Sequence, residues 1–312
     1  MIRTTRARLA LGAGTLAAAL FTTGSAMGAM GMPTTKKTTK TVTLRFVAVA
    51  GTTPVSCGTL TPGLGTGAAP AQIQDLRFYI SNVKLIAMNG RQVPLHLTGS
   101  RNFNLTKGGN AVTLIDMENG KGSCTEGDAA TNTVIRGTVP AGTYMGARFY
   151  VGVPFPLNHT DTVTAKPPLD LAAMGWAWQA GRKFMKVEVT DPGGAAGAWP
   201  AKTFMVHLGS TGCVGNPASG QTVSCGASNR VSVHLMSFNP AKQRIAFDLK
   251  ALLAGNDVTR NTAATAPGCM SGPTDPECAG VFGALDVNWK ADGTGTGVSG
   301  PGHDQTVFRA IN

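Results

Sequence analysis

The chain has 312 residues, of which 42% are hydrophobic and 14% are charged, with 41 glycines and six cysteines. Its formal net charge of +11 comes mostly from lysines and arginines that are scattered singly. No basic helix and no arginine cluster with interleaved aromatics is present, which argues against a nucleic-acid-binding protein.

The first 29 residues have the pattern of a secretory signal peptide, with a basic start, a charge-free apolar stretch over residues 9–20 and a suitable cleavage point at Ala26 or Ala29. The apolar stretch is shorter than the roughly 20 residues of a membrane-spanning helix, and no later segment approaches that length, so we expect no membrane span. Loss of the leader, which carries three arginines and no acid, would lower the net charge to +8. We expect a soluble, exported protein.

After the leader we expect a flexible, Thr- and Lys-rich segment over residues 30–40 and then a single β domain over residues 41–312. Apolar and polar residues alternate over residues 42–48, the period of a half-buried strand. A second strand is expected at 75–86, and the Asn89-Gly90 turn leads from it into a returning strand. Further strands are expected at 111–117, 133–139, 143–153, 183–190, 202–208, 230–238 and 243–249.

Helical periodicity appears only at residues 248–253, and the glycine-rich run at 63–67 neither follows a strand nor opens a helix, so it is interpreted as a turn. Glycine, threonine and valine are abundant and turns recur at short intervals. The sequence therefore predicts an all-β fold, an antiparallel β-sandwich or open barrel with long loops.

An even number of cysteines in an exported chain indicates disulfides. Two pairs bracket short loops, Cys213 with Cys225 and Cys269 with Cys278, and this leaves Cys57 with Cys124. Six cysteines allow 15 connectivities, and this pairing follows from proximity along the chain. With all six paired, no thiolate remains as a nucleophile or metal ligand.

Enzyme signatures are missing from the sequence. It has no Gly-x-Ser-x-Gly elbow, no His-Glu-x-x-His pair and no phosphate-binding Gly-x-x-x-x-Gly-Lys loop, and its few carboxylates show no close pair for acid–base catalysis. We therefore expect a protein that is not an enzyme.

Among the five histidines, His159 follows a predicted strand and His207 ends one beside a cysteine. Each is either a hydrogen-bonded structural residue or a metal ligand. His96 and His234 alternate out of phase with the apolar faces of their strands and are expected to face solvent. His303, in a glycine-rich loop, is the weakest candidate.

The segment 175–181 contains Trp176 and Trp178, two of only four tryptophans. In an extended strand, residues two apart point to the same face, so the two indoles are expected to stand side by side. Core packing is the alternative interpretation of this pair.

The sequence resembles the MbnP-like proteins, also called metallo-mystery-pair four-Cys-motif proteins. The matching pieces run in order through most of the mature chain: Ser56-Cys57-Gly58, residues 75–85, 114–118, 152–154 with Asn158-His159, Pro168-Leu169, 174–184, 207–213, 268–271 and 305–309. Two positions depart from the family pattern. Met117 stands where an aromatic is usual, and Arg182 stands where a tyrosine is expected, a change that could alter the surface near the tryptophans.

The resemblance implies a periplasmic copper-binding protein, in the periplasm or associated with the outer surface, paired with a di-haem MauG-like or peroxidase-like protein. In the family that partner oxidises the first Trp of a Trp-x-Trp motif to kynurenine, which here is Trp176. An indole has no in-plane lone pair, whereas kynurenine offers an aryl amine and a ketone. We expect His159 and His207 to complete a site for copper, as Cu(I), with Trp178 and Met174 in support.

Two other classes of function are alternatives to copper homeostasis. A blue-copper electron carrier needs a free cysteine with two histidines, which six paired cysteines do not provide. A disulfide-stapled module that binds carbohydrate or a surface would use Trp176 and Trp178 as a stacking platform, without metal. Kynurenine formation distinguishes copper homeostasis from both alternatives.

Overall fold

The computed structural model describes residues 38–176, 181–216, 221 and 224–312. The signal peptide expected over residues 1–29 and most of the segment expected over 30–40 lie outside these residues. The described residues belong to one compact unit. Strand β1 (Thr39–Ala50) starts two residues before the β domain was expected to begin.

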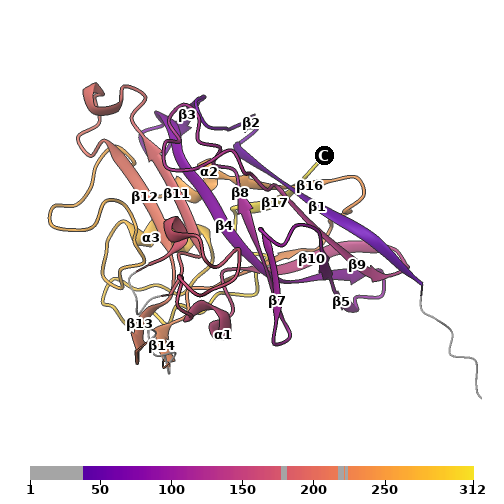
Figure 1. Ribbon diagram of the computed structural model, residues 1–312. Helices are drawn as coiled ribbons and strands as arrows, with labels where there is room; N and C mark the ends of the chain where they lie inside the picture. The colour runs from indigo at the N-terminus through magenta and orange to yellow at the C-terminus, as the bar shows by residue number, and fades with distance from the viewer. Residues whose placement is uncertain (1–37, 177–180, 217–220, 222–223) are drawn as a thin grey trace, which may run out of the picture. The chain divides into compact units, whose positions relative to one another are not determined.

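Two large sheets build most of the described domain (Figure 1). The smaller sheet has the order β17-β16-β1-β9-β6, with β2 paired to β1, and only its β1–β16 pair is parallel among the described strands. Its strands besides β1 are β2 (Thr53–Pro54), β6 (His96–Thr98), β9 (Val134–Pro140), β16 (Arg244–Asp248) and β17 (Phe308–Ile311).

The larger sheet is antiparallel and is built around β4 (Ala69–Ala87), a strand of 19 residues. Its order is β12-β11-β4-β10-β15, with β3, β5 and β8 also paired to β4 and β7 paired to β8. These strands are β3 (Leu60–Leu64), β5 (Gln92–Pro94), β7 (Asn104–Lys107), β8 (Asn110–Asp116), β10 (Tyr144–Val151), β11 (Met185–Thr190), β12 (Thr203–Leu208) and β15 (Val231–Leu235).

Five phenylalanines join the two sheets into a sandwich. Phe46, Phe247 and Phe308 come from the smaller sheet, and Phe78 and Phe149 come from the larger one. All five are at most 2% exposed, and their ring centroids lie 5.1–6.0 Å apart. Rings at this spacing add packing energy to the burial of their area. The fold is the all-β sandwich that the sequence predicts.

Short elements connect the sheets. Helix α2 (Leu249–Leu253) starts where helical periodicity was predicted, because the side chain of Asp248 caps it by accepting hydrogen bonds from the amides of Lys250 and Ala251. The others are α1 (Phe155–Asn158), α3 (Cys278–Ala284), the 3₁₀ turns η1 (Ala172–Met174) and η2 (Gly194–Ala196), and the hairpin β13 (Thr211–Val214) with β14 (Ser224–Ala227). No described helix is long and apolar enough to cross a membrane.

The three predicted disulfides are confirmed: Cys57–Cys124, Cys213–Cys225 and Cys269–Cys278. The second joins paired positions of the β13–β14 hairpin. The interpretation of 63–67 as a turn was only partly right, since β3 runs to Leu64 before the turn begins. Gly65 is required there, because its φ is +68° and a Cβ would lie 2.4 Å from the carbonyl oxygen of Asn256.

Candidate metal centre

A row of polar residues crosses the outer face of the larger sheet. In the register of β12, β11, β4 and β8, His207 pairs with Lys186, Lys186 with Arg77, and Arg77 with Asp116. Side chains at paired positions point to the same face, and side chains alternate along each strand. The neighbouring Phe78 therefore points into the sandwich core, and the polar row points away from it.

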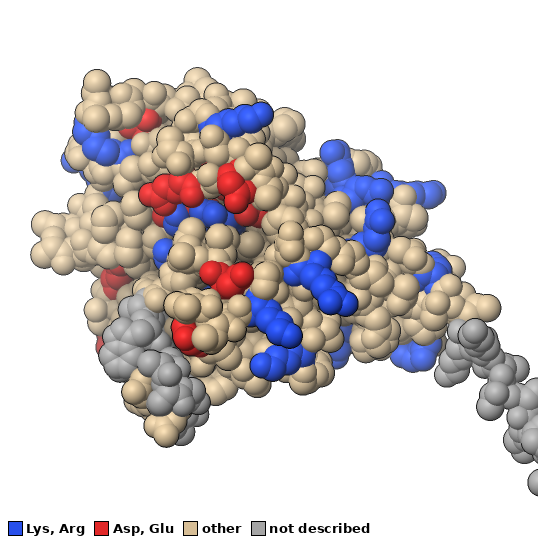
Figure 2. All heavy atoms as spheres, viewed as in Figure 1, with Lys and Arg blue, Asp and Glu red and all other residues tan. Residues whose placement is uncertain are grey.

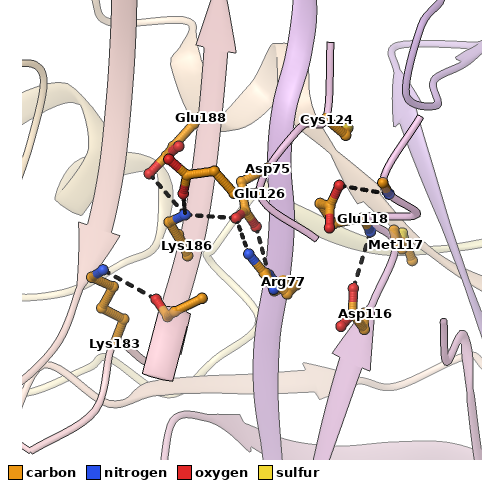
Figure 3. A network of polar contacts seen from close by, with 12 residues as sticks. Asp75, Arg77, Asp116, Met117, Glu118, Cys124, Glu126, Lys183, Lys186 and Glu188 are labelled. Atoms are coloured by element: carbon orange, nitrogen blue, oxygen red, sulfur yellow. Dashed lines mark hydrogen bonds and ion pairs between the residues drawn. The ribbon is translucent and has the colours of Figure 1, made fainter. Parts of the chain in front are cut away.

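Lys186 is the centre of a buried ionic network on this face (Figure 3). Its Nζ lies 2.7 Å from Asp75 Oδ2, 3.1 Å from Glu126 Oε2 and 3.4 Å from Glu188 Oε1. Arg77 donates to the other oxygen of Asp75 at 2.9 Å. Burial opposes the charge of Lys186, but the charges of Asp75 and Glu188 outweigh it and raise the pKa of the lysine. In Figure 2, acidic atoms border basic ones over the β11 and β4 part of the molecule.

Glu188 connects this network to His207. Its Oε1 lies 2.6 Å from His207 Nε2, and both residues are buried. Burial alone would raise the pKa of Glu188, but the hydrogen bond with His207 and the charge of Lys186 lower it below its usual range. The backbone of His207 is also fixed, because its N–H donates to the Cys269 carbonyl at 2.9 Å and its carbonyl accepts from Ser271 Oγ at 3.0 Å.

Trp176 lies against His207. The two rings meet edge-on, with centroids 6.2 Å apart and planes at 84°. The approach depends on Gly209, where a Cβ would lie 2.7 Å from a carbon of the indole. The backbone N–H of Trp176 donates to the Gly181 carbonyl at 2.9 Å, which ties these two residues together.

His159 is buried at the C-terminal end of α1. Its Nε2 lies 3.2 Å from Asn158 Nδ2 and 3.4 Å from Cys225 Sγ, and its ring packs 4.7 Å from that of Phe155. Asn158 Oδ1 in turn accepts from the backbone N–H of Arg182 at 2.9 Å. His159 is therefore attached, through Asn158, to the same segment that carries Trp176.

Arg182 corrects an expectation from the sequence. We expected it to alter the surface near the tryptophans, but it is fully buried. Its guanidinium donates to the carbonyls of Leu169 at 2.8 Å, Leu157 at 3.3 Å and Asn158. Burial lowers its pKa. The large side chain thus fixes the 157–169 segment from within and leaves the surface unchanged.

The other predicted site residues have different surroundings. Trp178, which was expected beside Trp176, lies outside the described residues. Trp176 itself follows the turn η1 and belongs to none of the named strands, contrary to the expectation of an extended strand. Met174 is fully buried among core side chains. His96 is exposed as expected, whereas His234 is half-buried, and its desolvation lowers its pKa.

Three groups of side chains in the described part of the chain bring His, Cys, Asp or Glu ligand atoms within 4.8 Å of one another. Two of them, His159 with Cys213 and Cys225, and Glu118 with Cys57 and Cys124, rely on sulfurs that are already in disulfides. The third, Asp75 with Glu126 and Glu188, surrounds the Lys186 ammonium. The imidazole of His207, beside Trp176, is a donor that suits a soft or borderline metal ion.

Sequence reasoning missed the Asp75, Lys186 and Glu188 network. Lys186 and Glu188 stand two apart in a predicted strand, as do Asp75 and Arg77 in another, so each pair was visible as one polar face. The sequence does not reveal that the two strands pair with each other. This pairing brings the charged side chains of Asp75, Arg77, Lys186 and Glu188 close together.

The described residues form a disulfide-stapled β-sandwich in which the buried His207 lies against Trp176. The sequence model of the MbnP family matches residues 39–271, and this chain belongs to that family. The solved structure of MbnP from Methylosinus trichosporium is similar, with 35% sequence identity and a TM-score of 0.76. The match covers 88% of this chain and 98% of that one. No curated protein matches the chain. Family membership supports a copper-related, MbnP-type function with a metal-binding role.

Proposed function

We propose that this protein binds Cu(I) in the periplasm, at a site formed by His159, His207 and Trp176 after oxidation of Trp176 to kynurenine. The edge-on contact between Trp176 and His207 supports the proposal, since a ligand formed from this indole would lie next to an imidazole. A di-haem protein of the MauG type is the partner that carries out the oxidation. The protein itself is a binding protein and not an enzyme.

The donor set fits this chemistry. An unmodified indole offers only an N–H donor, whereas the aryl amine and ketone of kynurenine have lone pairs that a metal ion can use. Neutral imidazole is a good ligand for copper in both oxidation states. Buried histidines with hydrogen-bonded neighbours are typical of ligands whose orientation is fixed before the metal binds. Three disulfides suit an oxidising compartment.

The alternatives have less support. All six cysteines are in disulfides, so the thiolate that a blue-copper centre needs is missing. A stacking platform for sugars requires an open aromatic face, and Trp176 is half-buried with its ring against His207.

The test is copper content and intact mass of the protein produced with and without its di-haem partner. We expect the mass gain of kynurenine formation, and tight copper binding, only with the partner present. His159→Ala and His207→Ala should each lose tight copper binding and remain folded. His96→Ala is the matched control, because His96 is exposed on β6. This variant should bind copper as the wild type does. Loss of copper in the His96 variant with retention in the other two would refute this choice of ligands.

A further inference from the structure

Glu188 approaches His207 diagonally across the β11–β12 pair. Lys186 is the direct partner of His207 in the register, and Glu188 is the partner of Met205. Residues on diagonal positions of one face are within reach of long side chains, and here Oε1 and Nε2 come to 2.6 Å. Glu188 is 5% exposed and His207 is 7% exposed, so water does not compete freely for this contact.

The surroundings of Glu188 decide which partner donates. The same Oε1 that contacts His207 lies 3.4 Å from Lys186 Nζ, and that ammonium is also held by Asp75 at 2.7 Å (Figure 3). A carboxylate beside an ammonium stays ionised and can only accept hydrogen bonds. His207 must then donate from Nε2, and the lone pair of the neutral ring is on Nδ1.

We propose that Glu188 is a positioning residue that fixes His207 as the Nε2–H tautomer and so assigns Nδ1 as its copper-binding atom. This inference rests on the proposed copper site. Carboxylates that accept from the second nitrogen of a metal-bound histidine orient the ring and make it a better donor, and their loss commonly weakens metal binding roughly 10- to 100-fold.

A metal-free measurement tests the tautomer first. Nitrogen-15 NMR of the imidazoles, assigned with His207→Ala, should show a protonated Nε2 and an unprotonated Nδ1 for His207. A proton on Nδ1 would overturn the inference. This experiment uses the unaltered protein without copper, so it is independent of whether the copper site is correct and of whether any Glu188 variant folds.

Three variants, produced with the di-haem partner, then test the effect on copper. Glu188→Met removes the acceptor at similar volume, and Cu(I) affinity measured by competition with a coloured chelator should fall roughly 10- to 100-fold. Glu188→Gln keeps a carbonyl oxygen that can accept from Nε2 and should recover most of the affinity. Glu126→Gln removes a charge from a side chain that is 65% exposed and pairs with Lys186 rather than with His207, and should bind copper as the wild type does.

The outcomes separate the two proposals. If His207→Ala binds Cu(I) as tightly as the wild type, the copper site is wrong and the role of Glu188 falls with it. If His207→Ala loses Cu(I) while Glu188→Met binds it at wild-type affinity, only the role of Glu188 is overturned. A purely structural Glu188 would lower the melting temperature without changing the tautomer or the affinity, and that result also overturns the inference.

Discussion

Trp176 has an environment suited to becoming a ligand. It is half-buried, its backbone is tied to Gly181, and its ring contacts a buried imidazole. The backbone hydrogen bond and the His207 contact would hold a modified side chain at this position in nearly the same place. Contacts that fix a side chain before the metal binds reduce the conformational cost of forming a metal site.

We expect Trp176→Phe to fold and keep its disulfides, because it preserves an aromatic ring at a half-buried position at modest cost. It should bind no copper tightly even when produced with the di-haem partner. Trp178→Phe is the matched control and should still gain kynurenine at Trp176. Mass spectrometry of peptides covering 175–182, together with copper content, measures both. Tight, stoichiometric copper in Trp176→Phe would contradict the proposed mechanism.

Arg182 is the residue that holds the His159 segment in place. Its guanidinium donates to carbonyls in two stretches, Leu157 with Asn158 and Leu169, and so links them. Buried carbonyls that lose their donors are costly, about 1–3 kcal/mol for each unsatisfied group.

Arg182→Met should therefore lower the free energy of unfolding by about 2–4 kcal/mol, because some carbonyls will find water instead. Thermal unfolding of the metal-free protein measures this effect. Arg101→Met, at an exposed position, is the control and should change stability little. An equal loss of stability in the two variants would show that the buried hydrogen bonds of Arg182 do not stabilise the segment.

At the scale of elements, the row of polar residues formed by His207, Lys186, Arg77 and Asp116 is covered by other segments of the chain. The segment around Glu126 and the loop around Pro168 lie over the outer face, the latter held by Tyr79, whose hydroxyl donates to the Pro168 carbonyl at 2.8 Å. These covering segments shield the residues at the ends of the row from water. Burial raises the pKa of Asp116 to about 7, although Arg77 and the amide of Glu118 act in the opposite direction.

This raised pKa predicts a pH dependence of stability. The unfolded chain releases the proton of Asp116 near pH ~4, whereas the folded protein keeps it to about 7, so the folded state binds more protons in between. The free energy of unfolding therefore falls as pH rises through this window.

Asp116→Asn, which keeps the Oδ1 that accepts from the Glu118 amide, should be more stable than the wild type at about pH 8, on the order of 1–3 kcal/mol, and should lose more than half of this advantage at about pH 5. Urea unfolding at both pH values measures it. An advantage that is the same at both values would refute the shift.

The strands were predictable because each carries its own period-2 pattern. Residues 183–190 alternate Met185, Val187 and Val189 with Lys186 and Glu188, and local sequence was enough to assign the strand. Elements stabilised by distant contacts escaped prediction. Strand β17 (Phe308–Ile311) is an example, since it forms by pairing with β16, more than 60 residues earlier in the chain.

The candidate site, too, could be predicted only in part from the sequence. His159, His207 and Trp176 were chosen from their motifs and the family resemblance. Glu188 was not, because its role depends on the register of β11 against β12. Register is set by the packing of the whole sheet and by its turns, so local sequence does not define it.

At the scale of the whole molecule, the two faces of the larger sheet have separate tasks. One face builds the aromatic core with the smaller sheet, and the other carries His207, Lys186 and Arg77. Substitutions at the site therefore leave the core packing in place, so copper binding and folding can be measured independently.

Loss of individual disulfides should likewise affect folding stability and copper binding to different degrees. In the chain-entropy account, Cys57–Cys124, with a sequence separation of 67, stabilises the fold by about 4.4 kcal/mol, and Cys213–Cys225, with a separation of 12, by about 2.8 kcal/mol. Replacing the first pair by serines should therefore lower the free energy of unfolding more than replacing the second. Chemical denaturation of both double variants, without metal, measures the difference.

For copper binding, loss of the Cys213–Cys225 disulfide should have the larger effect. Cys225 Sγ lies 3.4 Å from His159 Nε2, so loss of the Cys213–Cys225 disulfide disturbs the surroundings of a proposed ligand, whereas Cys57–Cys124 lies against the β4 backbone at Ile73. We expect the Cys213/Cys225 double serine variant to lose more Cu(I) affinity, despite being the more stable of the two. Equal copper affinity in both variants would show that the β13–β14 hairpin does not support the His159 side of the site.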